Sequence, residues 1–196
     1  ADPTAFPATP STEHWSSSPY AFGTSQAWYV SFALGFVSYT GKSDAYGVRC
    51  VRGDAWHAGS FEPLTLAGDR VVRDATTGLE WQGCIAGVTG DTCDTGSMAE
   101  MNWQAAVAYC DALSWAGHDD WRLPSRNEFQ SIVDRGRYSP ASDVTAFPGP
   151  SGDWFWLSTS RANSASSAWH VLLFDGHVNY FGKSLEDCVR CVRGGP

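Results

Sequence analysis

Residues 169–194 read WHVLLFDGHVNYFGKSLEDCVRCVRG, and the chain carries this segment twice. The earlier copy, residues 28–53, reads WYVSFALGFVSYTGKSDAYGVRCVRG, so the displacement from position 28 to position 169 is 141 positions, without insertion or deletion. The register also holds upstream, because residues 4–7 and residues 145–148 both read TAFP. A repeat of this length predicts that one supersecondary unit is built twice.

The two copies differ in an alternating pattern. Apolar residues stay apolar at every second place, in the pairs Val30/Val171, Phe32/Leu173, Val37/Val178 and Tyr39/Tyr180. No pair agrees at the places between them, which are Tyr29/His170, Ser31/Leu172, Ala33/Phe174, Leu34/Asp175, Phe36/His177, Ser38/Asn179 and Thr40/Phe181. Period two is typical of strands that bury one face. We therefore predict a hairpin with a scaffold face and an opposite varying face made of the second set of pairs.

Length and composition limit the classes of protein. A chain of 196 residues that is 43% hydrophobic can bury a core, and suits one domain with extra material or two small domains. Its net charge of −8 argues against a nucleic-acid partner. No apolar run is long enough to span a bilayer, so direct membrane insertion is not expected, and no signal peptide is recognisable. Ten Trp and twenty Gly predict a loop-rich fold packed with aromatic residues.

Six cysteines in a chain poor in Lys favour an oxidising compartment, and therefore a secreted or cell-surface protein. Cytosolic thiols or a metal site are the alternative. Cys84 and Cys93 flank a short Gly- and Thr-rich segment, and closing such a loop is worth about 3 kcal/mol. We predict a Cys84–Cys93 disulfide.

The repeat divides the chain into three parts. Residues 1–53 are expected to form the C-terminal half of a first repeat, 54–68 a linker without clear periodicity, and 69–196 a complete domain. Within that domain, residues 70–81 predict two short strands joined by a Thr-Thr-Gly turn.

Two helices are expected after these strands. Ser97 and Glu100 form a capping-box pattern, so the first helix should begin there and end near position 113, with Cys110 facing the core. Ser125 and Glu128 repeat the pattern and predict a second helix that ends near position 134.

A set of short motifs carries a family resemblance. They are Gly-Leu-x-Trp at 78–81, Tyr109-Cys110, DWRLPS at 120–125 followed by Glu128, Trp156-x-Ser158-Thr159, Ala168-Trp169-x-Val171 and VRCVR at 189–193. Together they resemble the DUF1566 family, also called the Lcl C-terminal domain. The resemblance covers about 70–195 in full and 4–53 as a C-terminal half.

The resemblance implies an α+β, C-type-lectin-like fold related to the formylglycine-generating-enzyme type, loop-rich and disulfide-containing, with two helices and small antiparallel sheets. It also implies a secreted or surface-exposed protein, since the best-known member is a bacterial adhesin that binds sulfated polysaccharides. It further implies a disulfide between Cys110 and Cys191. Cys50 and Cys188 then remain, and we expect them to pair by elimination.

C-type-lectin-like domains, including relatives of this family, also serve as variable proteins of diversity-generating retroelements, which mutate adenines in AAC codons. Every mismatched pair of the varying face lies within the residue set that such changes yield, whereas Gln26 and Glu186 fall outside it. The simpler alternative is ordinary drift on a solvated surface. Large apolar and aromatic groups at nominally outward positions favour an interaction site instead.

We therefore expect a non-enzymatic module that binds a protein or glycan through the second hairpin and the loop before it, without a cofactor. The expected ligand-binding residues are Arg161, Asn163, His170, Leu172, Phe174, Asp175, His177, Asn179 and Phe181. The expected core residues are Trp156, Trp169, Val171 and Val178. Two alternatives are a thiol oxidase of the formylglycine-generating type and a structural or homo-oligomerising unit of a larger surface protein.

Other motifs have plainer interpretations. The Cys188-x-x-Cys191 spacing suits a redox or metal pair, but we expect two structural cysteines, and the His118-Asp119-Asp120 loop suits Ca²⁺ but more often forms a turn. Arg122 and Arg190 are expected to pair with carboxylates such as Glu128. No nucleophile accompanies a base, and the histidines lack metal-ligand spacing, so no catalytic and no metal residues are predicted.

Overall fold

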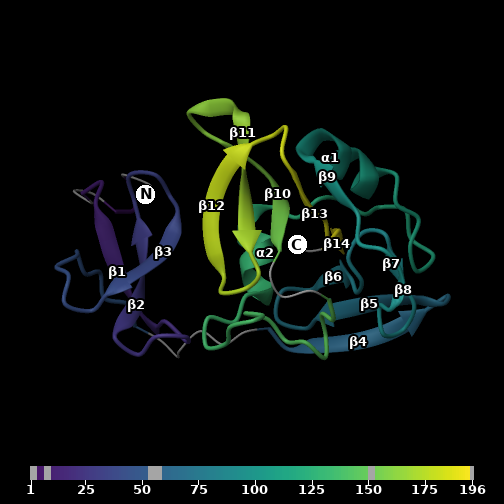
Figure 1. Cartoon of the computed structure of the whole chain (residues 1–196), viewed down its shortest axis with the longest axis horizontal. Coiled ribbons are helices and arrows are strands. Elements are labelled where there is room, and N and C mark those ends of the chain that lie inside the picture. Colours follow the sequence, from purple (N-terminus) through teal and green to yellow (C-terminus); the bar gives the residue numbers. More distant parts are fainter. Residues whose placement is uncertain (1–3, 7–9, 53–58, 150–152, 195–196) are drawn as a thin grey trace.

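The computed structural model describes residues 4–6, 10–52, 59–149 and 153–194. In chain order the elements are β1 (Glu13–Pro19), β2 (Gln26–Ser31), β3 (Val37–Gly41), β4 (Phe61–Leu66), β5 (Asp69–Asp74), β6 (Leu79–Gln82), β7 (Val88–Thr89), β8 (Thr95–Gly96), β9 (Glu100–Asn102), α1 (Trp103–Asp111), α2 (Arg126–Phe129), the 3-10 turn η1 (Gln130–Ile132), β10 (Trp154–Arg161), β11 (Ser164–Leu172), β12 (His177–Gly182), β13 (Glu186–Cys188) and β14 (Val192–Gly194). The described chain is β-rich with short helices, an α+β arrangement (Figure 1).

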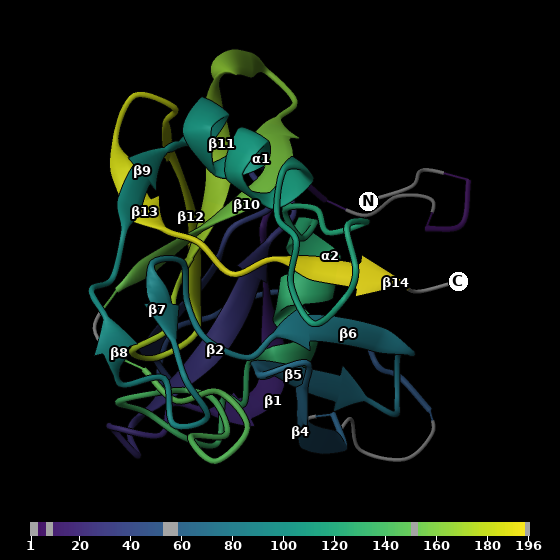
Figure 2. The same cartoon turned by 90° about the vertical axis from the view of Figure 1, so that its right-hand side faces the viewer.

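The main sheet of the described residues has the strand order β1-β2-β3-β12-β11-β10-β13-β9, and a second sheet has the order β14-β6-β5-β4. The third sheet pairs β7 with β8. Figure 1 shows the strands of the first copy on one side of the hairpin β11–β12 and the second sheet on the other side. Figure 2, turned by 90°, shows α2 beside the main sheet and above β5.

The centre of the main sheet has local two-fold symmetry. β1, β2 and β3 are equivalent by the repeat to β10, β11 and β12, and the sheet order runs through the second set in reverse. The copies meet where β3 and β12 pair antiparallel at Val37 and Val178, which occupy the same place in the repeat. Pairing of equivalent residues is the geometry of a two-fold, isologous contact. Because directly opposed residues point to the same side, the scaffold faces of both copies share one side and the varying faces share the other.

The scaffold side packs into the core through Trp169, Val171 and Val178, whereas Trp156 pairs directly with His170 and therefore points to the other side of the sheet. Trp156, Trp169, Val171 and Val178 are all buried, as predicted. They belong to one hydrophobic cluster that also contains Phe129 of α2 and residues of the second sheet. The hairpin therefore packs on the helix and the smaller sheet through the positions that stay apolar in the repeat.

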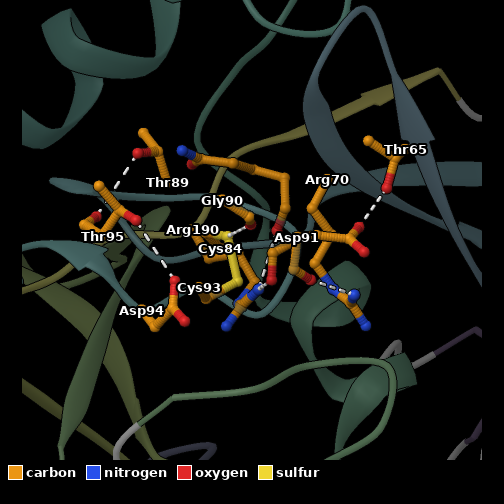
Figure 3. The surroundings of a disulfide bond; sticks show 12 residues. Thr65, Arg70, Cys84, Thr89, Gly90, Asp91, Cys93, Asp94, Thr95 and Arg190 are labelled. Atoms are coloured by element: carbon orange, nitrogen blue, oxygen red, sulfur yellow. Dashed lines mark hydrogen bonds between the residues drawn. A yellow bond between two sulfur atoms is a disulfide. The ribbon is translucent and has the colours of Figure 1, made fainter.

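Two of the three expected disulfides are confirmed. Cys84 is bonded to Cys93 and Cys110 is bonded to Cys191. Figure 3 shows the first bond beside Arg70, whose guanidinium donates hydrogen bonds to the carbonyl oxygens of Asp91 and Thr145. Arg70 thereby fastens the disulfide loop to the segment that precedes β10.

The expected start of the first helix is wrong. α1 begins at Trp103, and the side chain of Asn102 caps it by accepting a hydrogen bond from Ala105 N. The capping pattern at Ser97 and Glu100 is not used, because Glu100 already pairs with Cys188 as part of β9. The sheet therefore takes the backbone groups that the first helical turn would have needed.

The second helix begins as predicted. Ser125 and Glu128 form a complete capping box. The helix continues from α2 into η1, which ends at Ile132, close to the expected end near position 134.

The segment before the second sheet contains a strand. Within the predicted linker 54–68, Phe61–Leu66 forms β4 and pairs along its length with β5, while residues 53–58 lie outside the described residues. Pro63 is tolerated because β4 is an edge strand. The predicted strand pair at 70–81 is confirmed as β5 and β6. The division of the chain into repeat units remains a prediction.

Polar contacts hold the first copy against the second. The guanidinium of Arg126 donates a hydrogen bond to the Gly35 carbonyl oxygen and lies 4.2 Å above the Trp169 ring. Burial lowers the pKa of Arg126. The Tyr20 hydroxyl donates to Asp175 Oδ2 at 3.3 Å. The strands of the first copy therefore pack on the second copy and on α2 within the same chain.

Among the described residues, no helix combines the length and the apolar character that crossing a bilayer requires.

Candidate functional site

The varying faces of both copies form one continuous side of the sheet. In the first copy, Trp15 is paired with Tyr29 across β1 and β2. The ring of Tyr46 lies 4.8 Å from that of Trp15 and 5.0 Å from that of Tyr29, and Phe36 lies 6.0 Å from Tyr29. All four rings are partly buried, so each presents an edge or a face to solvent.

The second copy continues this surface beyond the β3–β12 contact. His177, Asn179 and Phe181 project from β12, and they face Leu172, His170 and Ala168 of β11. Phe181 is 50% exposed, and Leu172, His177 and Asn179 are partly buried. Five of the expected ligand-binding residues therefore do share one side of the sheet, together with aromatic residues of the first copy.

His170 is buried rather than exposed, which corrects the expectation for this residue. Its ring stacks on Trp154 at 3.9 Å and lies 5.5 Å from the ring of Phe181. Its Nδ1 is 2.9 Å from Asp187 Oδ2, while Nε2 has no hydrogen-bond partner among the described residues. With 3% of its surface exposed, His170 supports the face from beneath.

Asp175 is also buried, again against expectation. It lies in the turn between β11 and β12, where its carboxylate accepts hydrogen bonds from the Tyr20 hydroxyl and from His177 N. Its role is to join the two copies. Burial lowers the pKa of the neighbouring His177, although the Asp175 carboxylate acts in the opposite direction.

Arg161 and Asn163 lie on the opposite side of the sheet from His170. They line a cavity of about 460 Å³ together with Arg126, Trp169 and the turn of the first copy at 32–35. The Arg161 guanidinium lies 3.6 Å from the centre of the Tyr180 ring. Phe174, in the turn, is partly buried near Tyr138. These three expected residues are therefore not part of the shared face.

Two different residues at equivalent positions of the repeat can have the same structural role. Tyr20 is the repeat equivalent of Arg161, and it stacks at 3.7 Å on Tyr39, the equivalent of Tyr180. One copy thus covers its tyrosine with an aromatic ring and the other covers it with a cation. Variation at this position does not by itself indicate recognition.

Sequence reasoning missed the contribution of the first copy. Trp15, Tyr29, Phe36 and Tyr46 complete the face, yet the expected site was confined to the second hairpin. The signal was present in the register, because equivalent strands that pair through equivalent residues place both varying faces together. The sequence did not indicate that β3 pairs with β12, and without this pairing the two varying faces could not be joined.

The family scan matches the Lcl C-terminal domain over residues 1–52 and 70–193. The chain belongs to the Lcl C-terminal domain family. A search of curated proteins found no match. The first matched segment contains residues 28–52 of the first copy, and the second matched segment contains residues 169–193 of the second copy.

The expected Cys50–Cys188 bond is absent from this Lcl chain. Cys50 is an exposed free thiol beside β1, at one edge of the main sheet, whereas Cys188 is a buried free thiol in β13 near the other edge. Burial, with Asp153 and Glu100 alongside, raises the pKa of the Cys188 thiol to about 12. Since Cys191 is bonded to Cys110, the Cys188-x-x-Cys191 spacing offers no dithiol.

The described residues of the Lcl chain contain one mixed group of potential metal ligands. Glu100, Asp153 and Cys188 place their ligand atoms within 4.8 Å of one another, and the Cys188 thiol donates to Met98 Sδ at 3.2 Å. Exposed carboxylates often gather without an ion, so this group alone does not define a centre. His118 follows the turn at 116–117 and forms a bridge with Trp115, and Asp120 pairs with Arg193 at 2.6 Å.

The two motif arginines of the Lcl domain differ. Arg122 pairs with Glu128 through both guanidinium nitrogens at 2.9 and 2.5 Å, as predicted. Arg190 has no carboxylate among its hydrogen-bond partners in the described chain, which corrects the second prediction. It donates to the carbonyl oxygens of Gln82 and Gly83, and its burial lowers its pKa to about 9. Arg190 is therefore a structural cation.

Proposed function

We propose that this chain is a non-enzymatic binding module of a secreted or surface protein, which adopts a C-type-lectin-like fold and holds a protein or glycan on the shared varying face. The observation that carries the proposal is the convergence of positions that differ between the copies on a single aromatic side of the sheet. If these positions served only the structure of the hairpin, the two copies would be expected to keep similar residues there, as they do on the scaffold face.

The chemistry of this face suits recognition. Tyr, Trp and Phe supply large contact areas with few rotatable bonds, and such residues are enriched where proteins bind partners. Phe181 is exposed at one end of the surface, and Trp15, Tyr29 and Tyr46 form a packed cluster at the other. Asn179 and Ser38 add hydrogen-bonding groups between them. The disulfides suit an oxidising compartment.

Binding to a panel of immobilised neutral and acidic glycans and to a displayed peptide library tests the proposal. We expect a saturable ligand whose affinity falls at least tenfold, about 1.4 kcal/mol, in Phe181→Ala and in Tyr29→Ala. The matched control is Phe22→Ala, because Phe22 is 67% exposed but lies in the β1–β2 turn rather than on the face. Thermal unfolding of each variant separates lost contacts from lost folding.

Two outcomes would count against the proposal. One is the absence of any saturable ligand across both libraries. The other is a ligand whose affinity changes as much in Phe22→Ala as in Phe181→Ala, since the face would then have no special part in binding.

We also propose that a retroelement diversifies the face. The varying pairs are confined to residues that adenine changes in AAC codons yield. The codons of the gene test this: positions such as 170, 172 and 179 should concentrate AAC-derived triplets, while those of Trp169 and Val171 should not. An even codon distribution would refute diversification without touching the binding proposal.

A further inference from the structure

The same short sequence lies in opposite environments in the two copies. Residues 48–52 and 189–193 both read VRCVR. In the second copy Val189, Cys191 and Val192 are completely buried. Their equivalents in the first copy are exposed: Val48 by 72%, Val51 by 96%, and Cys50 as a free thiol. A segment that is core in one copy, where it ends in β14, is thus exposed in the other copy, where it forms no strand.

The first copy nevertheless holds this segment in the arrangement of the second. The Arg49 guanidinium lies 5.0 Å from the centre of the Phe6 ring, and the equivalent pair, Arg190 and Phe147, lies at 5.2 Å. His14 bridges Gly47 in parallel, as its equivalent Phe155 bridges Cys188. The exposed segment therefore keeps two of the contacts of its buried counterpart. Phe6 is 46% exposed, whereas Phe147 is 2% exposed.

The second copy shows what covers such a surface. Val192 pairs with Trp81 of β6, and Gln82 N donates to the carbonyl oxygen of Cys191. Ala86 N donates to the carbonyl oxygen of Val189. Finally, Cys110 of α1 forms the disulfide with Cys191. The cover is thus a strand such as β6 together with a helix that carries a cysteine.

We propose that residues 48–52 and Phe6 form a docking surface for the amino-terminal half of another Lcl unit. That half would contribute a strand like β6 and a cysteine-bearing helix like α1. It must be distinct from residues 59–149 of this chain, since these already hold residues 189–193. The partner is identified by the contacts of the buried copy: it must offer apolar residues and backbone hydrogen-bonding groups like those that cover residues 189–193. This inference stands apart from ligand binding on the varying face.

Docking places Cys50 opposite the partner's equivalent of Cys110, and we propose that the two form a disulfide. The two thiols together release two protons and two electrons. A small disulfide such as oxidised glutathione accepts them and leaves as two thiols. Closure of this bond would fix the docked state covalently, as the Cys110–Cys191 bond fixes the complete unit.

A fused chain tests the proposal. An additional copy of residues 59–149 is joined ahead of residue 9, which preserves the repeat register because position 149 is equivalent to position 8. The original and the fused chain are compared in a glutathione redox buffer by maleimide labelling and non-reducing peptide mapping. We expect labelling of Cys50 to fall at least tenfold, with Cys50 bonded to the Cys110 of the added half.

Matched variants separate docking from thiol chemistry. Cys110→Ser in the added half should abolish the bond but leave Cys50 slow to label, because docking alone buries it. Val51→Asp should restore rapid labelling, because a carboxylate cannot occupy the buried position of Val192. The fragment 59–141, which stops before the repeat equivalent of residues 1–8, is added to the original chain in trans as a second format.

Unchanged labelling of Cys50 in both formats would overturn the proposal. It would also be overturned if the added Cys110 bonded to Cys191 rather than Cys50, or if the bond to Cys50 formed equally well in Val51→Asp.

Discussion

His170 illustrates how little a varying position reveals about the task of the residue in it. The repeat leaves this position unconstrained, with Tyr29 as the equivalent, and Tyr29 does present its ring on the face. His170 instead stacks on Trp154 and bonds to Asp187, neither of which lies in its own hairpin. Neighbouring residues in β10 and β13 decide whether a side chain at this position is exposed for binding or buried beneath the face.

We predict that His170→Ala lowers the free energy of unfolding by about 1 to 3 kcal/mol, because it removes the stacking and leaves the Asp187 carboxylate buried without its partner. Urea denaturation measures this. Phe181→Ala, at an exposed site on the same surface, should cost less than about 1 kcal/mol. Equal losses in the two variants would contradict a supporting role for His170.

Glu128 gives the fold a specific acid sensitivity. Burial alone would raise its pKa, but hydrogen bonds from Arg122 and from Ser125 outweigh burial and lower the pKa to about 2. A depressed pKa contributes stability that is complete above the ordinary value near 4.5 and is lost as the pH falls toward 2.

We expect Glu128→Gln to lose about 1.5 to 3 kcal/mol at neutral pH, the usual range for hydrogen bonds to a charged group. It should also show a flatter stability profile between pH 4.5 and pH 2 than the unmodified chain, because its amide does not titrate there. Unfolding measured across this range checks both statements. Parallel profiles for the two chains would refute the assignment.

At the scale of elements, local sequence patterns correctly predicted the features that depend on local sequence. The alternation within the hairpin, the strand pair around Thr77 and the capping box of Ser125 are all found in the structure. The same capping pattern at Ser97 failed because β9 pairs with β13, some 85 residues further along the chain. A local signal of that kind cannot report a competing long-range partner.

The two caps give a paired prediction. Asn102→Ala should destabilise the chain by about 1 kcal/mol, because Asn102 caps α1 through Ala105 N. Ser97→Ala should change stability by less than about 0.5 kcal/mol, because Ser97 is an exposed residue outside the helix. Chemical denaturation of both variants measures the difference. A larger loss in Ser97→Ala would mean that the helix begins where the sequence pattern suggests.

At the scale of the whole molecule, the repeat becomes a symmetric sheet. The sequence predicted two similar hairpins, the side of each hairpin that is buried, and most of the residues on that side. It did not predict that the hairpins join edge to edge, because the pairing of β3 with β12 rests on tertiary contacts such as Arg126 with Gly35 and Tyr20 with Asp175. The shared varying face depends on that junction.

The most direct test of this account is therefore nuclear Overhauser spectroscopy across the β3–β12 junction. In a sample in which every chain is isotopically labelled, we predict cross-strand contacts between the backbone protons of Val37 and Val178. In an equimolar mixture of labelled and unlabelled chains, an isotope-filtered spectrum should contain no such contact, because the pairing is within one chain. Absence of the contact in the first sample, or its presence in the filtered spectrum, would contradict a varying face shared by the two copies of one molecule.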